Sequence, residues 1–294
     1  MNTHRSSYSA HSFSTDFKRE AKRLDAQVDL FWNVESDFYS RIGIATAGSL
    51  VDLGSGTGRL LLRLKERFPG LAITGVEIDA TLIDTAIRSF AKAGMDVPVF
   101  INASILNTPL PDAAFDVAVF RLVLEHLPEP LQVLREAARI LKPGGRIVAI
   151  DNDFDFHLRT WPPMHELDDY YAAYCEAREK DGGHPRIGRQ LPVLLRQAGF
   201  SDVTLEVLCA HSQNMGDALF LKSEGLGIPD QLVKSGFFNG KKFFSMKKKW
   251  SAMLRCPGHA IVRQLFYATG INTERQLVRQ RDAMNGVPTV IESP

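Results

Sequence analysis

The chain has 294 residues, of which 45% are hydrophobic and 23% are charged, and its formal net charge is +1. This length suits one large domain with additions or two small domains. No apolar run approaches the ~20 residues that a membrane-spanning helix needs, and the N-terminal residues contain no apolar segment typical of a secretory signal. The three widely spaced cysteines predict neither a disulfide framework nor a metal site. We therefore expect a cytoplasmic protein without a membrane span.

Positive charge is concentrated near the C-terminus. Residues 221–294 carry 12 Lys or Arg and 5 Asp or Glu, so their net charge is +7 and that of residues 1–220 is −6. In "GKKFFSMKKKW", three aromatic residues interleave with five lysines. The stretch could be a nucleic-acid or membrane-surface patch, or an amphipathic helix whose aromatics pack inward. We favour the helix, because one short lysine cluster in a nearly neutral protein is a weak electrostatic signal.

Short apolar runs alternate with helical segments along most of the chain. Apolar residues near helical spacing predict a helix at residues 17–43, before the core. Strands are predicted at residues 49–53, 71–78, 97–102, 115–120, 144–151, 201–210 and 261–270. Helices are predicted between them at residues 58–68, 80–94, 130–141 and 189–200, and residues 211–258 are largely helical.

Helices of this length between strands indicate right-handed crossovers and a parallel sheet. We predict an α/β fold, with a doubly wound, Rossmann-like sheet of seven mostly parallel strands. We expect an N-terminal helical lid at residues 1–45, a core at 46–210, a helical insertion at 211–258, and the last strand with a tail at 259–294. The lid and the insertion could cover the crevice beyond the carboxyl ends of the strands, where such sheets bind ligands.

A glycine-rich turn, "VDLGSGTGRL", links the first strand of the core to its helix. Gly54, Gly56 and Gly58 form a G-x-G-x-G pattern, whereas a dinucleotide site needs its third glycine where the chain has Arg59. Asp52 precedes the turn. A unit charge about 4 Å from another is worth ~4 kcal/mol at an effective dielectric of 20, which is repulsive beside a pyrophosphate and attractive beside an ammonium. The turn therefore favours a ligand that has a cation at its near end.

An acidic residue at the end of the second strand adds a ribose contact. Glu77 lies 23 residues after Gly54, close to the ~20-residue offset at which a carboxylate binds the two ribose hydroxyls. An ammonium, a carboxylate and a ribose together describe S-adenosylmethionine (SAM). Residues 45–210 resemble the class I SAM-dependent methyltransferases in "VDLGSGTG", "GVEID", "LPDAAFDVAVFRLVLEHL" and "RILKPGGRIVAID". The "LEHL" stretch resembles the ubiquinone- and menaquinone-biosynthesis-like branch, whose members methylate small molecules.

This resemblance implies the residues that hold the methionine and ribose parts of SAM. It implies that Asp52, Gly54 and Gly56 hold the methionine end, that Ser55 contributes its backbone, and that Glu77 holds the ribose. A glycine-rich turn can also serve only close packing, and an aspartate there can serve only as a helix cap.

The same resemblance implies contacts to the adenine and to the methyl group. Ile78 would cover one face of the adenine. Ser104, with Ile105 beside it, stands where the family usually has an acidic residue near the adenine amino group, and a serine accepts a hydrogen bond more weakly. Arg121, at the end of the fourth strand, would line the floor near the reacting methyl.

The N-terminal helix resembles a helix that lies over SAM in many small-molecule methyltransferases. The resemblance rests on "EAKRLDAQ" and implies that Arg23 and Gln27 contact the methionine carboxylate and that Tyr8 closes the pocket. The alternative is that these residues only pack the helix.

Two residues are candidates for catalysis, His126 and Arg121. Methyl transfer depends mainly on positioning, which can contribute ~7–11 kcal/mol, and it needs a base only if the acceptor loses a proton. His126 has the ordinary pKa range of a general base. Its "LEHL" stretch occurs in enzymes with unrelated substrates, so a structural role near the ligand is the alternative.

A run of oxygen ligands follows the fifth strand. Asp151, Asn152, Asp153 and Asp155 resemble the magnesium site of catechol-type O-methyltransferases. That site also needs an aspartate at the end of the fourth strand, where this chain has Arg121. We therefore expect no metal and interpret the run as ordering a loop.

The acceptor is the least defined part of the prediction. Aromatic residues near the mouth of the crevice would suit a flat or apolar acceptor, although each could belong to the core instead; they are Trp161, Tyr170, Tyr171, Tyr174, Phe237 and Phe238. We predict an enzyme that methylates a small molecule on an undetermined atom. We expect no nucleic-acid partner, and a homodimer is an open possibility. The alternatives are an RNA methyltransferase that uses the lysine cluster, and a SAM-binding protein that catalyses another reaction.

Overall fold

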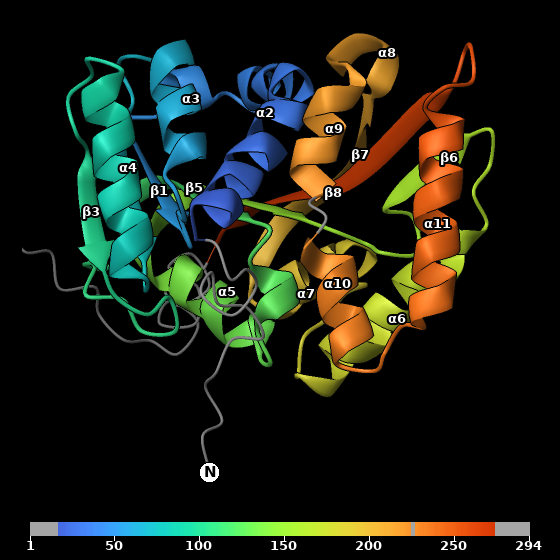
Figure 1. Ribbon diagram of the computed structural model, residues 1–294. Helices are drawn as coiled ribbons and strands as arrows, with labels where there is room; N and C mark the ends of the chain where they lie inside the picture. The colour runs from blue at the N-terminus through green and yellow to red at the C-terminus, as the bar shows by residue number, and fades with distance from the viewer. Residues whose placement is uncertain (1–16, 225–226, 274–294) are drawn as a thin grey trace, which may run out of the picture.

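The computed structural model describes residues 17–224 and 227–273, and an eight-stranded sheet runs through this part of the chain (Figure 1). The strands are β1 (Ser49–Leu53), β2 (Ala72–Glu77), β3 (Val99–Asn102), β4 (Phe115–Arg121), β5 (Leu141–Asp151), β6 (Leu158–Trp161), β7 (Phe200–His211) and β8 (Ala260–Asn272). The helices are α2 (Phe17–Arg41), α3 (Arg59–Arg67), α4 (Ala80–Lys92), α5 (Pro130–Ile140), α6 (Glu166–Lys180), α7 (Leu191–Gln197), α8 (Ser212–Met215), α9 (Asp217–Glu224), α10 (Gly227–Lys234) and α11 (Gly240–Met253). Within the described residues, no helix meets the length and hydropathy that a membrane span requires.

The order of the strands confirms the predicted sheet. β3, β2, β1, β4 and β5 lie side by side in this order and are parallel. β8 pairs with β5 in the antiparallel direction, with Asp151 opposite Phe266, and β7 pairs with the other edge of β8. Helices α8 to α11 lie between β7 and β8 in the chain. The chain therefore has the predicted fold class, a Rossmann-like and mostly parallel sheet with a helical insertion before the last strand.

The strand count differs from the predicted seven, because the structure adds β6. This strand has four residues and pairs with the first part of β8, with Leu158 opposite Arg263. β5 and β6 thus follow each other along one edge of β8, which is 13 residues long. Only Leu158 of β6 is buried. So short a run with one buried apolar residue carries too little periodicity to be recognised from sequence.

Successive residues of the central strands pack into two cores, one on each face of the sheet. Leu50 and Val119 belong to the core that also contains apolar residues of α2 and α3. Val51 and Phe120, their neighbours in the chain, belong to the core that contains residues of α5 and α7. Side chains alternate between the two faces of a strand, and each fully buried Leu, Val or Phe stabilises the fold by roughly 1.5–3 kcal/mol. The central residues of these strands are apolar on both faces, because helices cover both sides of the sheet.

The N-terminal helix α2 joins one of these cores and lies beside α3 and α9 (Figure 1). It buries Phe31, Phe38 and Tyr39, and the ring of Phe38 lies 5.1 Å from that of Tyr267 on β8. α9 belongs to the helical segment before β8. Helices from both ends of the described chain therefore meet on one side of the sheet.

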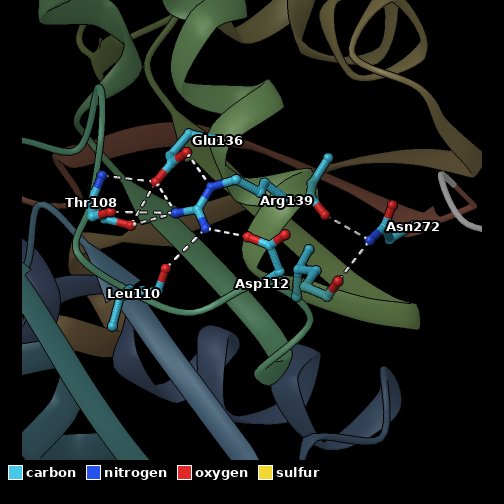
Figure 2. Close-up of polar contacts among 8 residues, drawn as sticks. Thr108, Leu110, Asp112, Glu136, Arg139 and Asn272 are labelled. Atoms are coloured by element: carbon cyan, nitrogen blue, oxygen red, sulfur yellow. Dashed lines mark hydrogen bonds and ion pairs between the residues drawn. The ribbon is translucent and has the colours of Figure 1, made fainter.

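A partly exposed ionic network anchors the loop between β3 and β4 (Figure 2). Arg139 on α5 donates to the carbonyl oxygen of Leu110 at 2.9 Å and pairs with Asp112 and with Glu136, both at 2.6 Å. Glu136 also accepts from the backbone N–H of Thr108 at 2.8 Å. Because this network holds the loop against α5, the residues just after β3 have a defined position at the edge of the sheet.

Candidate active site

A cavity of about 250 Å³ lies at the carboxyl ends of β1, β2, β4 and β5. Residues of α2, α6, α9 and β8 complete its wall. The described residues that the sequence nominated for SAM binding or catalysis all line it: Arg23, Gln27, Asp52, Gly54, Ser55, Gly56, Glu77, Ile78, Ser104, Ile105, Arg121 and His126. Tyr8 lies outside the described residues. The structure thus brings together side chains that are up to 103 positions apart (His126 and Arg23).

The glycine-rich turn bends sharply at the outer end of the cavity. Gly54 and Ser55 donate backbone hydrogen bonds to the carbonyl oxygen of Val76 at 2.8 and 3.0 Å. Gly54 has a φ of +87°, and a β-carbon there would lie 2.6 Å from Val123, so only glycine fits. Gly56 has a φ of +53°, and a β-carbon there would meet no atom within 4 Å. The turn therefore leaves open space beside its backbone.

Asp52 is the buried carboxyl group beneath this turn. It is 2% exposed, and its Oδ1 has no hydrogen-bond partner. Burial raises its pKa to about 7; Arg121 opposes the rise and Glu77 adds to it. The hydroxyl of Ser55 is also buried without a partner. A carboxyl group in such a place is well suited to a cation, which would replace the lost hydration of its ionised form.

Glu77 and its neighbours form the next part of the wall. Its carboxylate accepts backbone hydrogen bonds from Gly56 at 2.8 Å and Asp79 at 3.0 Å, while burial raises its pKa. Ile78 follows and is 71% exposed, an uncommon position for a large apolar side chain beside a cavity. Asn102 donates to the carbonyl oxygens of Glu77 and Ile78 at 3.0 and 2.9 Å and so fixes the end of β2.

Arg121 is held by partners that the sequence did not reveal. Its guanidinium pairs with Glu35 of α2 at 2.9 Å and donates to the carbonyl oxygen of Gln27 at 2.8 Å. Glu35 is fully buried and also accepts from the hydroxyl of Tyr267 at 2.7 Å. This arrangement joins α2, β4 and β8. Arg121 therefore borders the cavity while its charge is balanced inside the protein.

His126 lies in the short 3₁₀ helix η2 (Leu124–His126) that follows β4. Burial, with Arg178 and Arg23 nearby, lowers the pKa of its imidazole to about 3. Its Nε2 lies 3.6 Å from Oε1 of Glu125, whose pKa burial raises to about 7. An imidazole with so low a pKa accepts a proton weakly. Of the two neighbours, Glu125 is the stronger base.

The acidic run after β5 divides between two environments. Asp151 accepts backbone hydrogen bonds from Glu125 at 3.2 Å and Asn152 at 2.9 Å, and burial raises its pKa well above the ordinary value. Asp153 and Asp155 instead pair with Arg189. Within residues 17–224 and 227–273, no group of three metal-ligating side chains is close enough to hold an ion.

The inner end of the cavity is aromatic, with a few charged groups. Tyr170, Tyr171 and Tyr174 of α6 line it, as the sequence suggested for these aromatic residues. Trp161 on β6 does not line the cavity and is 65% exposed. Phe237 and Phe238 are not among the lining residues. The sequence missed further lining residues, which are Phe154, His157, Glu224 and Arg263. A lone arginine inside an otherwise apolar predicted strand was the available signal for the last of these.

Comparisons with known proteins identify the family. A model described as "Methyltransferase domain" matches residues 51–149. The ubiquinone/menaquinone biosynthesis C-methyltransferase UbiE of Desulfotalea psychrophila is 32% identical over 195 residues, which is 65% of this chain and 70% of that protein. The chain belongs to the class I SAM-dependent methyltransferases of the quinone-biosynthesis type. This methyltransferase is also 35% identical over 102 residues to the demethylmenaquinone methyltransferase of Thermus thermophilus, covering 35% of this chain and 46% of that enzyme.

Other relatives and solved structures agree with this membership. The 27-O-demethylrifamycin SV methyltransferase of Amycolatopsis mediterranei is 36% identical over 103 residues, which is 35% of this chain and 38% of that one. The matched stretch thus spans less than half of two of these three relatives. Phosphoethanolamine N-methyltransferase 2 of Haemonchus contortus, solved with SAM, has the same fold, with a TM-score of 0.55, 17% identity, and coverage of 84% of this chain and 56% of that one.

SAM is the cofactor of the family to which the chain belongs. The outer end of the cavity fits it, because the buried Asp52 has a carboxylate oxygen without a partner and the open space beside Gly56 admits a ligand against the backbone. A pyrophosphate would instead meet the charges of Asp52 and Glu77. SAM supplies a methyl group on a positively charged sulfur.

Proposed function

We propose that this methyltransferase binds SAM at the glycine-rich end of the cavity and methylates a small molecule held at the tyrosine-lined end. One observation carries the proposal: one continuous cavity has backbone and carboxylate groups at one end and aromatic side chains at the other. The names of the relatives, which refer to quinones and to a rifamycin, support a small acceptor.

Within this proposal, the residues at the glycine-rich end of the cavity each contact a different part of SAM. Asp52 takes the ammonium, Gly54 and Gly56 with the backbone of Ser55 border the methionine, and Glu77 accepts the ribose hydroxyls. The burial of Asp52 and the orientation of Glu77 by Gly56 support these roles.

The remaining outer residues surround the adenine and the carboxylate of SAM. Ile78 packs on the adenine, and Ser104 with Ile105 borders its edge; the exposure of the Ile78 side chain supports this contact. Arg23 and Gln27 lie on α2 at the cavity wall, which supports a contact to the methionine carboxylate. The proposed closure by Tyr8 falls outside the described residues.

Arg121 and His126 act by positioning. The pairing of Arg121 with Glu35 supports a role in fixing α2 over the bound SAM, rather than in the transfer step. The low pKa of His126 supports a neutral imidazole that shapes the cavity. The cavity wall aligns the acceptor with the methyl group, which is the main requirement of such a displacement.

The decisive experiment is product analysis. The purified chain is incubated with SAM and candidate small molecules, and S-adenosylhomocysteine and the methylated product are detected by mass spectrometry. Calorimetry with SAM, with NAD and with FAD as controls, measures the cofactor preference. Absence of SAM binding, or binding of a dinucleotide in its place, would contradict the proposal.

The second candidate is a SAM-binding protein that catalyses another reaction. The [4+2]-cyclase SpnF has the same fold, with a TM-score of 0.50 and 19% identity over 80% of this chain and 79% of that one. The fold alone therefore does not determine the reaction. An acceptor that is converted without formation of S-adenosylhomocysteine would favour this candidate.

Nothing in residues 17–224 and 227–273 favours the RNA alternative. In α11, Phe243 and Trp250 pack against the core and Lys242 pairs with Asp169 at 2.7 Å, as the amphipathic interpretation predicts, whereas Phe244 is 66% exposed and departs from it. Affinity for RNA that falls steeply with salt would contradict this interpretation. A cytoplasmic location and a homodimer stay predictions, which fractionation and sedimentation can test.

A further inference from the structure

The strand β7 forms one edge of the sheet over a long stretch. It has 12 residues, about twice the usual length of a strand. Residues 204–211 pair with β8 without interruption, and no described residue pairs with the other edge of β7. An irregularity between Ser201 and Thr204, where Asp202 has a φ of +47°, precedes this regular stretch. An edge strand presents a row of unpaired backbone N–H and C=O groups, to which a further strand can bind.

One face of this edge carries a row of apolar side chains. Leu205, Val207 and Cys209 alternate along the strand and so share one face. Leu205 and Val207 are 41% and 43% exposed, and Cys209 is exposed as well. Phe156, which is 48% exposed, extends the row, because its ring lies 6.2 Å from that of Phe266, the partner of Val207 on β8. Natural sheets normally avoid an exposed apolar row on an unpaired strand.

The opposite edge of the sheet, β3, is protected in ways that β7 is not. β3 has only four residues, and Pro98, which has no backbone N–H, stands immediately before it. Residues 204–211 contain neither proline nor lysine. Their one carboxylate, Glu206, pairs with Arg41 of α2, so the stretch has no net charge that would repel a second copy. Both edges expose apolar side chains, and Val99 of β3 is 62% exposed. The difference between them is therefore the protection, which β7 lacks.

We propose that β7 pairs with β7 of a second copy of this chain, in the antiparallel direction and about a two-fold axis at Val207. A two-fold axis brings the same surface of each copy together, and this strand is complementary to itself. The pairing sets Leu205 opposite Cys209 and Glu206 opposite Leu208 of the other copy, so the apolar row of one copy meets that of the other. An axis at Glu206 would instead set two like charges opposite each other, which is unfavourable. The axis at Val207 also keeps the pairing within residues 204–210, clear of the irregularity.

A second copy is the occupant that closes the assembly. Once the two β7 edges have paired, the joined sheet ends on both sides at β3, which is the protected edge. The contact is then saturated by two copies, because the same surface is used up on each. A different partner of β7 would need a free strand edge of its own. The self-complementary row and the neutral pair of Glu206 with Arg41 therefore favour a dimer.

The pairing also supports the wall of the cavity. β8 lies between β7 and β5 and carries Arg263, which lines the inner end. In the monomer, β7 is held in the sheet from one side only. In the dimer, strands on both sides hold it, and it braces β8 in turn. The dimer does not depend on the reaction that the site catalyses, so it can be tested without an acceptor.

Sedimentation velocity of the full chain, from low to high micromolar concentration, tests the association. We expect an equilibrium between monomer and dimer for the wild type. Val207→Lys sets two lysines opposite each other at the axis and should weaken the dimer by about tenfold or more. Val99→Lys, the same change at an exposed position of β3, is the matched control and should leave the equilibrium unchanged. Circular dichroism shows whether both variants are folded.

Disulfide formation tests the register. Residues directly opposite each other in antiparallel strands have Cα atoms about 4.5–5.5 Å apart, which a disulfide can span. Under mild oxidation, Val207→Cys should form a linked dimer, and Leu205→Cys should link to the native Cys209 of the other copy. The second link should be lost in the double variant Leu205→Cys, Cys209→Ser, and Val99→Cys should stay unlinked.

Three results would each overturn the inference. They are a wild type that sediments as a monomer at every concentration, a dimer that is unchanged in Val207→Lys, and equal linking of Val207→Cys and Val99→Cys. A monomer would indicate that another part of the same chain, or no strand at all, covers the edge of β7. If Val207→Lys is not folded, the disulfide pattern decides by itself.

Discussion

The two ends of the cavity are built from different kinds of chain segment. The SAM end uses residues between Asp52 and Ile105, which lie where three neighbouring parallel strands end, together with the covering helix α2. The acceptor end draws mainly on α6, α9 and β8, from Phe154 to Arg263. The cofactor end is thus built mainly at the ends of parallel strands, while the acceptor end is built mainly from the helices α6 and α9 together with the antiparallel strand β8.

The largest effect is expected at Glu35, which links α2 to Arg121 of β4 and to Tyr267 of β8. Glu35→Gln should leave the charge of Arg121 buried and unbalanced, and we expect it to lower the free energy of unfolding by about 3–5 kcal/mol. Urea unfolding followed by circular dichroism measures the change. The double variant Glu35→Leu, Arg121→Met removes both charges and should recover most of the loss; an equally unstable double variant would show that packing dominates.

A second test addresses the SAM end alone. Asp52→Asn removes the charge that we assign to the ammonium and should raise the Kd for SAM by about 100-fold, or roughly 2.7 kcal/mol. Titration calorimetry measures this. Asp84→Asn, at an exposed position of α4, is the control and should bind SAM as the wild type does. Unchanged affinity in the Asp52 variant would contradict the electrostatic role of this residue.

The pH dependence of SAM binding sharpens the same point. In the free protein the pKa of Asp52 is raised to about 7, so the carboxyl group is partly protonated at neutral pH. A bound cation favours the ionised form, which lowers this pKa, and SAM binding should therefore release a proton. We expect affinity to fall as pH drops from 8 to 6, by at most about tenfold per pH unit. Calorimetry in buffers of different ionisation enthalpy counts the protons, and Asp52→Asn should remove the contribution of this group.

The smallest effect is expected where SAM contacts the surface. Ile78→Ala removes apolar area beside the proposed adenine site and should weaken SAM binding by about 1–2 kcal/mol. Because Ile78 is 71% exposed, the melting temperature of the unliganded chain should hardly change. Loss of thermal stability with unchanged affinity would assign Ile78 to the fold instead of the site.

Sequence reasoning could nominate the residues of the proposed SAM end because they stand in local motifs. Asp52, the glycine turn and Glu77 each stand in short motifs at the end of a strand, and the parallel order of the strands brings these ends together. The same logic predicted the sheet and both covering helical regions. β6 was not predicted, because four residues with one buried side chain are too few to show the alternating pattern of a strand.

Glu35, Glu224 and Arg263 could not be predicted in the same way. Each is a charged residue in a helix or strand where the sequence alone indicates exposure. Their burial depends on partners far along the chain, such as Glu35 with Arg121. The role of His126 was open for a related reason, because its pKa depends on burial and on two arginines from other helices.

The contact between Glu35 and Tyr267 spans 232 positions of the chain. A nascent chain that has emerged only as far as β5 contains every SAM-binding motif but not the strand that ties α2 down. The cavity can therefore be completed only after β8 is synthesised. This strand carries both Tyr267, which contacts α2 through Glu35, and Arg263, which lines the acceptor end.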